Sequence, residues 1–268
     1  MSNPSRGRVL IVAGSDSGGG AGIQADIKAV TMLGGFAATA ITALTAQNTL
    51  GVHGVHEVPA AFVAQQMRVV LEDIGADAIK TGMLNSPSVI EAIVRVLDDV
   101  APHIPLVVDP VMVAKGGARL LQPEAEVALI EQLIPRATII TPNLPEAEAL
   151  IGKAIPDAAA MPAAAHSLLG LRPKAVLLKG GHLDSSELLD LLQTPEGETR
   201  FVAQRIDSRS THGTGCTLAS AIATGLAFGK PLRQAVAEAR DYVRQAMLTA
   251  PGLGQGHGPL NHGWPLNH

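Results

Sequence analysis

Short runs of aliphatic residues alternate with longer helical patterns along most of the chain, and this alternation is what most constrains the fold. The runs are apolar on both faces, as is typical of strands buried on both sides of a parallel sheet. They predict strands at Val9–Ala13, Ala78–Ile79, Leu106–Asp109, Thr138–Thr141 and Ala175–Lys179. Because helical patterns separate them, the sequence predicts an α/β fold with helices on both faces of the sheet.

Helical patterns fill the intervals between these runs. Several have proline near their start, at Pro87, Pro123 and Pro145, where its missing N–H costs no hydrogen bond. The predicted helices are Ala21–Leu33, Pro59–Ile74, Ser86–Val100, Pro123–Leu133, Pro145–Ile151, Thr214–Phe228 and Leu232–Leu248. Leu188–Leu192 and Thr199–Ala203 flank a Thr-Pro-Glu-Gly-Glu turn, which predicts a hairpin of antiparallel edge strands.

Length, charge and cysteine content narrow the class of protein. The chain has 268 residues without an internal linker, so we expect one domain over 1–268, with tails at 1–7 and about 251–268. Twenty Lys+Arg against 24 Asp+Glu, with no basic run, argue against a nucleic-acid partner. The apolar stretch Gly215–Gly229 falls short of the roughly 18 residues that cross a membrane. One cysteine, and a polar start at 1–8 without a signal-peptide core, favour the cytoplasm.

Polar residues and glycines gather where the predicted parallel strands end. In open α/β sheets, ligands bind outside the carboxyl ends of the strands. Any one cluster could simply turn a strand into the next helix, but five at the same edge favour a binding site. They are Gly14-Ser-Asp-Ser-Gly-Gly-Gly20, Thr81-Gly-Met83, Asp109-Pro-Val-Met112, Thr141-Pro-Asn143 and Lys179-Gly-Gly-His182.

The first glycine cluster continues into Gly20-Ala-Gly-Ile-Gln-Ala25, which formally matches the dinucleotide fingerprint G-x-G-x-x-A. That fingerprint needs an acidic residue about 20 positions later to hold the ribose. No acid lies between Asp26 and Glu57, so a nicotinamide site is disfavoured. The glycines would instead let a ligand approach the backbone. Asp26 lies in the first turn of the next predicted helix, where a carboxylate is also favourable with the helix dipole alone.

The segment Ile41–Gly51 contains Gln47, whose amide offers both an acceptor and donors. This pattern matches a heterocycle that carries an amine beside a ring nitrogen. The alternative is turn chemistry, since a Gln-Asn pair before Gly is typical of turns. His53 and His56 have no further ligands to complete a metal site, so we expect them at polar strand positions. Three histidines of the Gly/Pro-rich end are expected to be solvated: His257, His262 and His268.

Asn143 and Glu146 stand three residues apart where a predicted strand leads into a helix. Both side chains can therefore face one point. Oxygen ligands of this kind suit Mg²⁺, which binds through one or two carboxylates plus substrate phosphates. The alternative is a capping box, in which Asn143 caps the helix and Glu146 occupies its third position.

The segment Thr211-His-Gly-Thr-Gly-Cys216 opens a helix of small residues. Its glycines allow consecutive backbone N–H groups to point at an anion, with the helix dipole behind them. It is not a Walker A loop, because no G-x-x-x-x-G-K-[ST] occurs in the chain. Cys216 lies in the first helical turn, where the pKa of a thiol can be lowered. The alternative for Cys216 is a small buried hydrophobic residue.

Taken in order, these clusters resemble the ribokinase-like family, and within it the bacterial hydroxymethylpyrimidine and phosphomethylpyrimidine kinases of thiamine biosynthesis. The resemblance extends from about Val9 to Asn261. It is carried by Ala13–Asp26, Ile41–Thr49, Lys80–Leu84, Asp109–Met112, Thr141–Ala147, Leu178–His182, Thr211–Cys216 and Gly256–Asn261. It implies a three-layer α/β/α sandwich around a mostly parallel sheet with antiparallel edge strands.

The resemblance also implies an activity. With Mg²⁺, ATP would phosphorylate the hydroxyl of 4-amino-5-hydroxymethyl-2-methylpyrimidine and then the resulting monophosphate, giving the diphosphate used in thiamine assembly. The family is typically homodimeric, and its partners are small molecules.

Functional residues follow from the resemblance by matching motifs. The anion-hole motif of the wider family usually ends in Asp, the general base, whereas here it ends in Cys216, as in the pyrimidine-kinase branch. The implied residues are, for the pyrimidine, Gln47, Gly14, Asp26, Met83 and Val111; for ATP, Lys179, Thr211 and Gly213; for magnesium, Asn143, Glu146 and Asp109; and for the catalytic anion hole, Gly213, Thr214, Gly215 and Cys216.

Two other functions stay open. A pyridoxal or pyridoxine kinase would share the fold and the anion hole, and only Ala46–Asn48 and the first glycine cluster separate it from a pyrimidine kinase. A nucleotide-binding module without catalysis is the second alternative. The presence of Asn143, Glu146, Lys179 and Cys216 together argues against it, because binding alone does not need all four.

Overall fold

A nine-stranded sheet organises the protein, which we describe from a computed structural model covering residues 7–114, 117–183 and 186–267. The strands lie in the order β3-β2-β1-β4-β5-β6-β7-β8-β9. Their bounds are β1 Arg8–Asp16, β2 Phe36–Asn48, β3 Gly51–Glu57, β4 Ala78–Thr81, β5 Leu106–Val108, β6 Ile139–Ile140, β7 Val176–Lys179, β8 Glu187–Thr194 and β9 Gly197–Gln204.

The centre of the sheet is parallel and both of its edges are antiparallel. Strands β2, β1, β4, β5, β6 and β7 run in one direction, while β3 pairs antiparallel with β2 at one edge. At the other edge β8 pairs antiparallel with β7, and β9 with β8. The five predicted buried strands all lie in the parallel part, and the predicted hairpin is β8–β9. The α/β class with antiparallel edge strands is confirmed.

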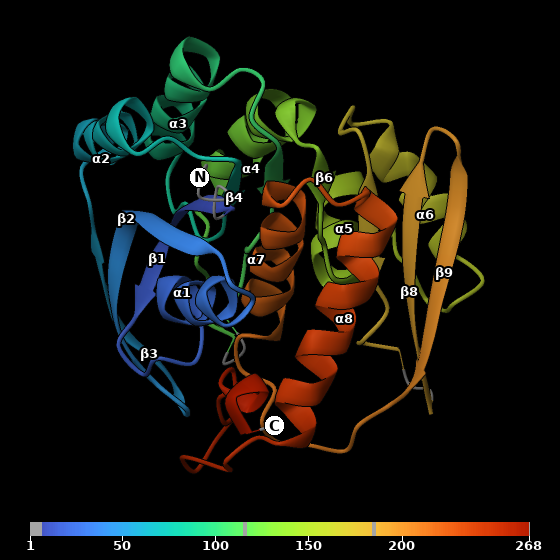
Figure 1. Cartoon of the computed structure of the whole chain (residues 1–268). Helices are drawn as coiled ribbons and strands as arrows, with labels where there is room; N and C mark the ends of the chain where they lie inside the picture. The colour runs from blue at the N-terminus through green and yellow to red at the C-terminus, as the bar shows by residue number, and fades with distance from the viewer. Residues whose placement is uncertain (1–6, 115–116, 184–185, 268) are drawn as a thin grey trace, which may run out of the picture.

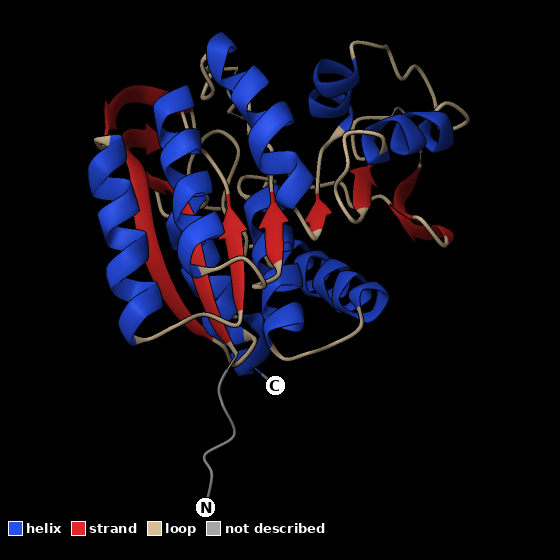
Figure 2. Ribbon diagram, turned by 90° about the horizontal axis from the view of Figure 1, so that it is seen from above, coloured by secondary structure: helices blue, strands red, loops and turns tan. Residues whose placement is uncertain are grey.

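Helices cover both faces of this sheet (Figures 1 and 2). One face packs against α1, α7 and α8, and the other packs against α2 to α6. The helices are α1 Gly22–Met32, α2 Ala60–Asp73, α3 Pro87–Val100, α4 Pro123–Ala128, α5 Leu144–Ile151, α6 Met161–Leu169, α7 Thr214–Ala227 and α8 Leu232–Leu248. After α4 the chain continues through a π-helical turn, Leu129–Leu133, and a 3₁₀ turn, Ile134–Arg136.

Alternate side chains of each central strand face opposite sides of the sheet and so contribute to two separate hydrophobic cores. In β1, Val9 and Ile11 face the α1/α7/α8 layer, and Leu10 and Val12 face the other layer, all with no exposed surface. The small residues of α7 let α8 pack closely, since a Cβ at Gly225 would lie 2.7 Å from the Cβ of Ala235. The protein is therefore an α/β/α sandwich with a hydrophobic core on each side of the sheet.

The segment after α8 folds back onto the molecule. Leu260 and His262 are each 4% exposed, and the Tyr242 hydroxyl donates to the His262 carbonyl oxygen at 2.7 Å. The expectation that His262 is solvated is wrong, because this segment covers the start of α7. His257 is exposed as expected, and His268 lies outside the described residues.

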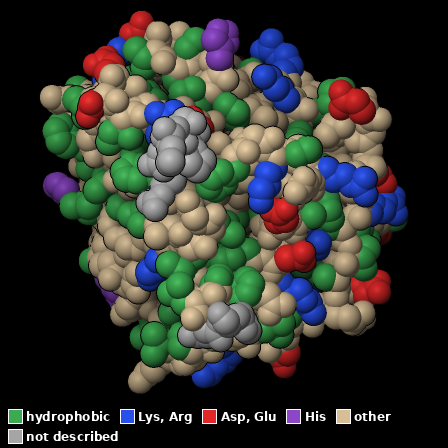
Figure 3. Space-filling model, in the orientation of Figure 1, with side chains coloured by type: hydrophobic (Ala, Val, Ile, Leu, Met, Phe, Trp, Pro, Cys, Tyr) green, Lys and Arg blue, Asp and Glu red, His purple; other side chains and the backbone are tan. Residues whose placement is uncertain are grey.

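The surface carries charges of both signs, as the nearly balanced numbers of basic and acidic residues in the sequence predict. On the face seen in Figure 3, acidic and basic side chains are interspersed, with no broad area of one sign. No helix within the described ranges is both long and apolar enough to span a membrane.

Candidate active site

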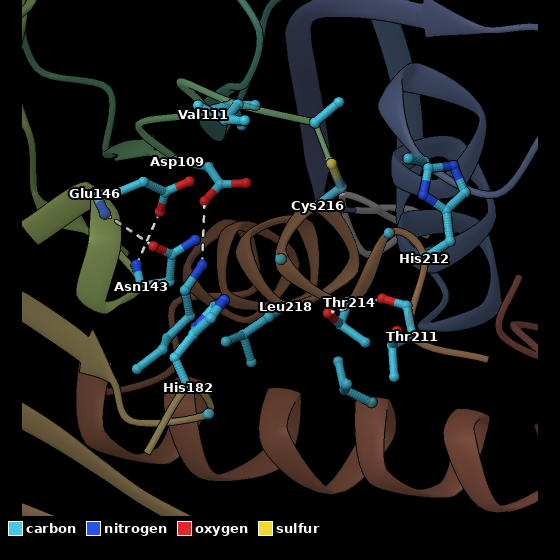
Figure 4. A pocket seen from close by; sticks show the side chains of 18 of the residues that line it. Asp109, Val111, Asn143, Glu146, His182, Thr211, His212, Thr214, Cys216 and Leu218 are labelled. Atoms are coloured by element: carbon cyan, nitrogen blue, oxygen red, sulfur yellow. Dashed lines mark hydrogen bonds and ion pairs between the residues drawn. The ribbon is translucent and has the colours of Figure 1, made fainter. Parts of the chain in front are cut away.

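A cavity of about 1160 Å³ opens at the carboxyl ends of the parallel strands. Segments that are distant in sequence meet there, including the ends of β1 and β5, the start of α5 and the start of α7 (Figure 4). The predicted site residues that line it are Gly14, Gln47, Met83, Asp109, Val111, Asn143, Glu146, Lys179, Thr211, Gly213, Thr214, Gly215 and Cys216. The cavity thus lies at the sheet edge that the sequence predicts.

The N-terminus of α7 points into this cavity. Gly213, directly before the helix, has a φ of +79°, and a Cβ there would lie 1.9 Å from the carbonyl oxygen of Gly20. Only glycine fits such a position. The first N–H groups of a helix have no partner within it and carry the positive end of the helix dipole. Those of Thr214, Gly215 and Cys216 can therefore bind an anion in the cavity.

Three charged side chains lie beside this helix terminus. Lys179 Nζ is 3.4 Å from Asp109 Oδ1, and Asp109 also accepts a hydrogen bond of 3.1 Å from the Thr141 hydroxyl. A Cβ at Gly215 would lie 3.3 Å from Lys179 Nζ and 3.6 Å from Asp109 Oδ2, so the absent side chain leaves room for both. Burial alone would lower the pKa of Lys179, but Asp109 and Glu146 outweigh it and raise that pKa. Lys179 is therefore a fixed positive charge next to the anion hole.

Asn143 and Glu146 form the capping box that the sequence left as an alternative. The Glu146 N–H donates to Asn143 Oδ1 at 2.9 Å, and the Asn143 N–H donates to Glu146 Oε2 at 2.8 Å. Burial raises the pKa of Glu146 to about 7; Asp109 adds to this rise and Lys179 opposes it. Capping and metal binding do not exclude one another, because a carboxylate has a second oxygen.

The side chains that line the cavity include possible oxygen ligands for magnesium. Among the described residues, no three His, Cys, Asp or Glu side chains cluster in a way that could hold a metal ion. Asp109 and Glu146 are nevertheless both buried carboxylates on the cavity wall. Mg²⁺ commonly takes only one or two carboxylates and completes its shell with waters and substrate phosphates. The residues present fit that kind of site.

The thiol of Cys216 differs from the expectation. Burial raises its pKa to about 12, with Lys80 opposing the rise and Asp26 and Asp109 adding to it. The expected lowering by the helix N-terminus is therefore wrong for the protein without bound ligands. Desolvation and two nearby carboxylates from distant parts of the chain outweigh the helix dipole.

Asp26 lies behind the cavity wall and does not line the pyrimidine pocket as expected. It is fully buried and accepts hydrogen bonds from Lys80 Nζ at 2.9 and 3.0 Å and from the Ser220 hydroxyl at 2.7 Å. Burial would lower the pKa of Lys80, but the charge of Asp26 and of its neighbours outweighs this and raises it. Asp26 thus neutralises a buried lysine that lines the cavity.

Two further cavity residues, Asp16 and His212, were not singled out in the sequence. His212 Nε2 lies 2.9 Å from Asp16 Oδ2 and 3.3 Å from Gln47 Nε2. The only local signal was the position of His212 directly before the Gly213 anion hole. The contact with Asp16 spans 196 positions in the sequence, so spacing could not have predicted it.

The C-terminal segment supports the anion hole from behind. The Thr217 hydroxyl lies 2.7 Å from the Gly213 carbonyl oxygen and 2.9 Å from His262 Nε2. Burial lowers the pKa of His262 to about 4, so at neutral pH this imidazole is uncharged. Because the Thr217 hydroxyl donates its single hydrogen to the Gly213 carbonyl oxygen, His262 Nε2 carries a hydrogen and donates it to Thr217. Thr217 and, through it, His262 thus fix the position of Gly213.

Comparison with known proteins agrees with this geometry. The family model described as phosphomethylpyrimidine kinase matches residues 16–261. The chain is 46% identical to a hydroxymethylpyrimidine/phosphomethylpyrimidine kinase of Streptomyces coelicolor, over 96% of this chain and 95% of that protein. It is 55% identical to the thiamine biosynthesis bifunctional protein ThiED of Geobacter sulfurreducens, over 96% of this chain but only 52% of that longer protein.

A solved structure extends the comparison to three dimensions. The ADP complex of Bacillus subtilis pyridoxal kinase superposes with a TM-score of 0.90 at 33% sequence identity, covering 98% of this chain and 100% of that one. The ribokinase-like fold implied by the resemblance is thereby confirmed. By the family match along most of its length, the chain belongs to the phosphomethylpyrimidine kinase family.

Proposed function

We propose that this protein is an ATP-dependent kinase that phosphorylates 4-amino-5-hydroxymethyl-2-methylpyrimidine to its monophosphate and then to its diphosphate, for thiamine biosynthesis. The observation that carries this proposal is the cavity itself. It brings the amide of Gln47 and the open N-terminus of α7 to one space, together with Lys179, Asp109 and Glu146. The Gln47 amide, which can recognise a heterocycle, therefore lies in the same cavity as the groups that can stabilise a transferring phosphoryl group.

The pyrimidine binds at the Gln47 end of the cavity. Its 4-amino group and neighbouring ring nitrogen form a donor–acceptor pair that complements one side-chain amide. Gly14, Met83 and Val111 line the same cavity and offer the flat heterocycle close backbone approach and apolar contact. The hydroxymethyl group then points toward the start of α7.

Phosphoryl transfer takes place at the Gly213–Cys216 end. Such transfers depend on positioning and on stabilising charge rather than on covalent chemistry by the protein. The N–H groups of Thr214, Gly215 and Cys216, together with Lys179, stabilise the charge on the transferring group. In the first step the substrate hydroxyl loses its proton as its oxygen bonds to the γ-phosphorus and ADP leaves. In the second step a phosphate oxygen is the acceptor, and no alcohol proton has to be removed.

Asp109 and Glu146 hold the magnesium that accompanies ATP. When bound, Mg²⁺ neutralises charge on the ATP phosphates and orients them. The pKa of Glu146 lies near 7 in the free protein because of burial. A cation bound beside it stabilises the ionised carboxylate and so lowers this pKa. Asn143 orients Glu146 through the capping box.

The nucleoside end of ATP occupies the part of the cavity between β9 and α8, beside Thr211 and Gly213. Apolar side chains from three elements line this part and suit an adenine ring: Val202, Leu218, Val243 and Met247. The base therefore binds by apolar packing, and the phosphates extend toward Lys179.

We further propose that the protein works as a homodimer in the cytoplasm, as the family resemblance implies. Sedimentation-velocity ultracentrifugation at micromolar concentration tests the assembly. A species of twice the chain mass of 27.6 kDa is expected. A single species of one chain mass would contradict it.

An ADP-release assay tests the substrate. Hydroxymethylpyrimidine and pyridoxine are compared in parallel, with ATP and Mg²⁺, because a pyridoxine kinase is the nearest alternative. We expect a higher kcat/KM for the pyrimidine, and we expect Gln47→Leu to reduce it by about 10²-fold as polar groups lose their partner. Turnover of pyridoxine alone would keep the fold and the anion hole but assign Gln47 a different heterocycle.

A further inference from the structure

A chain of three polar side chains connects the glycine loop after β1 to the amide that faces the pyrimidine. Asp16, His212 and Gln47 come from the end of β1, the approach to α7 and the end of β2. Asp16 is 3% and His212 is 8% exposed, so the contacts between them are shielded from water. On its other side, the Gln47 amide lies 3.1 Å from the Thr45 hydroxyl.

Asp16 is an ionised acceptor in this arrangement. Its carboxylate accepts from the N–H groups of Gly18, Gly20 and Ala21 at 2.8 to 3.0 Å, in addition to His212. Burial alone would raise its pKa, but the hydrogen bonds from His212 and from the backbone outweigh burial and lower that pKa. An ionised carboxylate can only accept, so His212 Nε2, 2.9 Å away, must carry a hydrogen.

The two neighbours of the Gln47 amide therefore have fixed polarity. His212 Nε2, once protonated, has one hydrogen and no lone pair, whether the imidazole is neutral or charged. It gives this hydrogen to Asp16 at 2.9 Å and can share it with an acceptor on Gln47 at 3.3 Å only as the longer branch of a three-centre bond. The Thr45 hydroxyl lies 2.9 Å from the Ser15 carbonyl oxygen, which can only accept, so its single hydrogen belongs there and its lone pairs face Gln47. With Gln47 Nε2 on the His212 side, two donors oppose one another. Turning the amide by 180° about its last bond converts both contacts into hydrogen bonds.

We infer that Asp16, acting through His212, is a positioning residue that sets the amide of Gln47 with its oxygen toward His212 and its nitrogen toward Thr45 when substrate binds. This inference rests on the proposed function. It goes beyond the role of Gln47, because it assigns the orientation of the amide and therefore the orientation in which the pyrimidine binds.

That direction decides where the reacting group lies. The remaining lone pair of Gln47 Oε1 accepts from the 4-amino group, and the remaining N–H of Nε2 donates to the ring nitrogen. The 4-amino group then lies on the His212 side, and the hydroxymethyl group on the next ring carbon lies beyond it. His212 is followed directly by Gly213–Cys216, so the hydroxyl reaches the anion hole. The opposite amide orientation would turn it away.

Substrate discrimination tests the inference. The 4-oxo analogue of the pyrimidine presents an acceptor and an N–H in the reverse order, so it requires the reversed amide. We compare the ratio of kcat/KM for the 4-amino and 4-oxo compounds in the wild type, His212→Leu and His212→Gln. His212→Leu removes the donor and should reduce the ratio by about 10- to 100-fold. His212→Gln keeps an N–H donor and should retain the ratio within about threefold of the wild type.

Control variants separate positioning from general damage. His166→Leu alters an exposed histidine on α6 and should leave the ratio unchanged. Thr45→Val, which removes the other anchor of the amide, should also reduce the ratio, and it keeps the test valid if His212→Leu does not fold. A ratio that stays at the wild-type value in His212→Leu or in Thr45→Val, with both substrates slowed equally, would overturn the inference. A wild type inactive on both pyrimidines would instead contradict the proposed function itself.

Discussion

At the scale of single residues, the site depends on charges that the fold buries together. Cys216 illustrates this, because its thiol is surrounded by Lys80, Asp26 and Asp109, which come from separate segments. The sequence identifies the cysteine and its helix terminus correctly. The direction of its pKa shift could not be predicted, since burial and neighbouring carboxylates emerge only from the tertiary structure.

The raised pKa of Cys216 leads to a test of whether its thiolate takes the proton of the substrate hydroxyl. With a pKa of about 12, the deprotonated form becomes more abundant as pH rises toward that value. The single-turnover rate of the first phosphorylation should then rise by up to about tenfold per pH unit between pH 7 and 9. The second phosphorylation, which removes no alcohol proton, should not share this slope.

Cys216→Ala should slow the first step by about 10²–10⁴-fold if the thiolate is the base, and should remove its pH slope. The second step should lose much less. Equal losses in both steps, measured in the same quenched-flow experiment, would show that Cys216 acts only through packing.

Asp26 should matter for stability through its buried partner. Asp26→Ala leaves Lys80 buried and unpaired, and we expect it to reduce the free energy of unfolding by about 3–5 kcal/mol in urea titrations. The exposed pair of Asp99 and Arg68 provides the control, and Asp99→Ala should cost less than about 1 kcal/mol. Equal effects of the two variants would contradict the buried-pair assignment.

At the scale of elements, the approach to α7 shapes the site most directly. Gly213→Ala requires φ of +79° and places a Cβ 1.9 Å from Gly20 O, so the loop must move. We expect at least about a 10²-fold loss of kcat/KM, as the aligned N–H groups shift. Gly229→Ala is a matched control, with φ of +75° but no atom within 4 Å of the new Cβ. It should cost only about 1–2 kcal/mol of stability and leave activity intact.

The start of α5 connects stability to pH. Glu146 has a folded-state pKa of about 7, above its ordinary value, so the folded protein without metal is destabilised as pH rises through that value. Glu146→Gln keeps the capping box without the charge. At pH 8 it should raise the free energy of unfolding by an amount on the order of 2–3 kcal/mol, and at pH 4 the difference should vanish.

Magnesium should stabilise the wild type and Glu146→Gln to different extents. Mg²⁺ with ATP should increase the melting temperature of the wild type much more than that of Glu146→Gln, because the variant lacks a carboxylate ligand. A variant that is no more stable than the wild type at pH 8, or equally stabilised by Mg²⁺ with ATP, would contradict this role for Glu146.

The elements that could be predicted are those whose signal is local. The parallel strands are continuous aliphatic runs, and α8 begins at Leu232 and ends at Leu248 as predicted. Strand β2 and helix α6 were missed, whereas β3 was anticipated only through the expected strand positions of His53 and His56, which lie in it. Thr and Gln interrupt the apolar pattern of β2, exposed His and Gly interrupt that of β3, and an Asn-Thr-Leu-Gly turn separates the two strands. Helix α6 lacks a side-chain cap, and Pro162 near its start is a local signal that the prediction did not use.

At the scale of the whole molecule, the sheet gathers residues that the sequence keeps apart. The order of the strands brings the ends of β1, β4, β5, β6 and β7 to one edge, and residues of α7 and α8 line the cavity there. The rule that ligands bind at this edge predicted five strand-end segments that each contribute to the cavity lining. Asp16 and His212 escaped prediction, because their pairing depends on the path of the C-terminal half back across the glycine loop.

The most direct test of the central claim, that one cavity transfers two phosphoryl groups to one pyrimidine, is a mass-resolved time course. Purified protein, Mg²⁺, excess ATP and 4-amino-5-hydroxymethyl-2-methylpyrimidine are mixed, and the pyrimidine species are quantified by mass spectrometry. We predict that monophosphate appears first and is then converted to diphosphate, with two ADP released per pyrimidine. Absence of any phosphorylated pyrimidine, or accumulation of monophosphate that never becomes diphosphate, would contradict it.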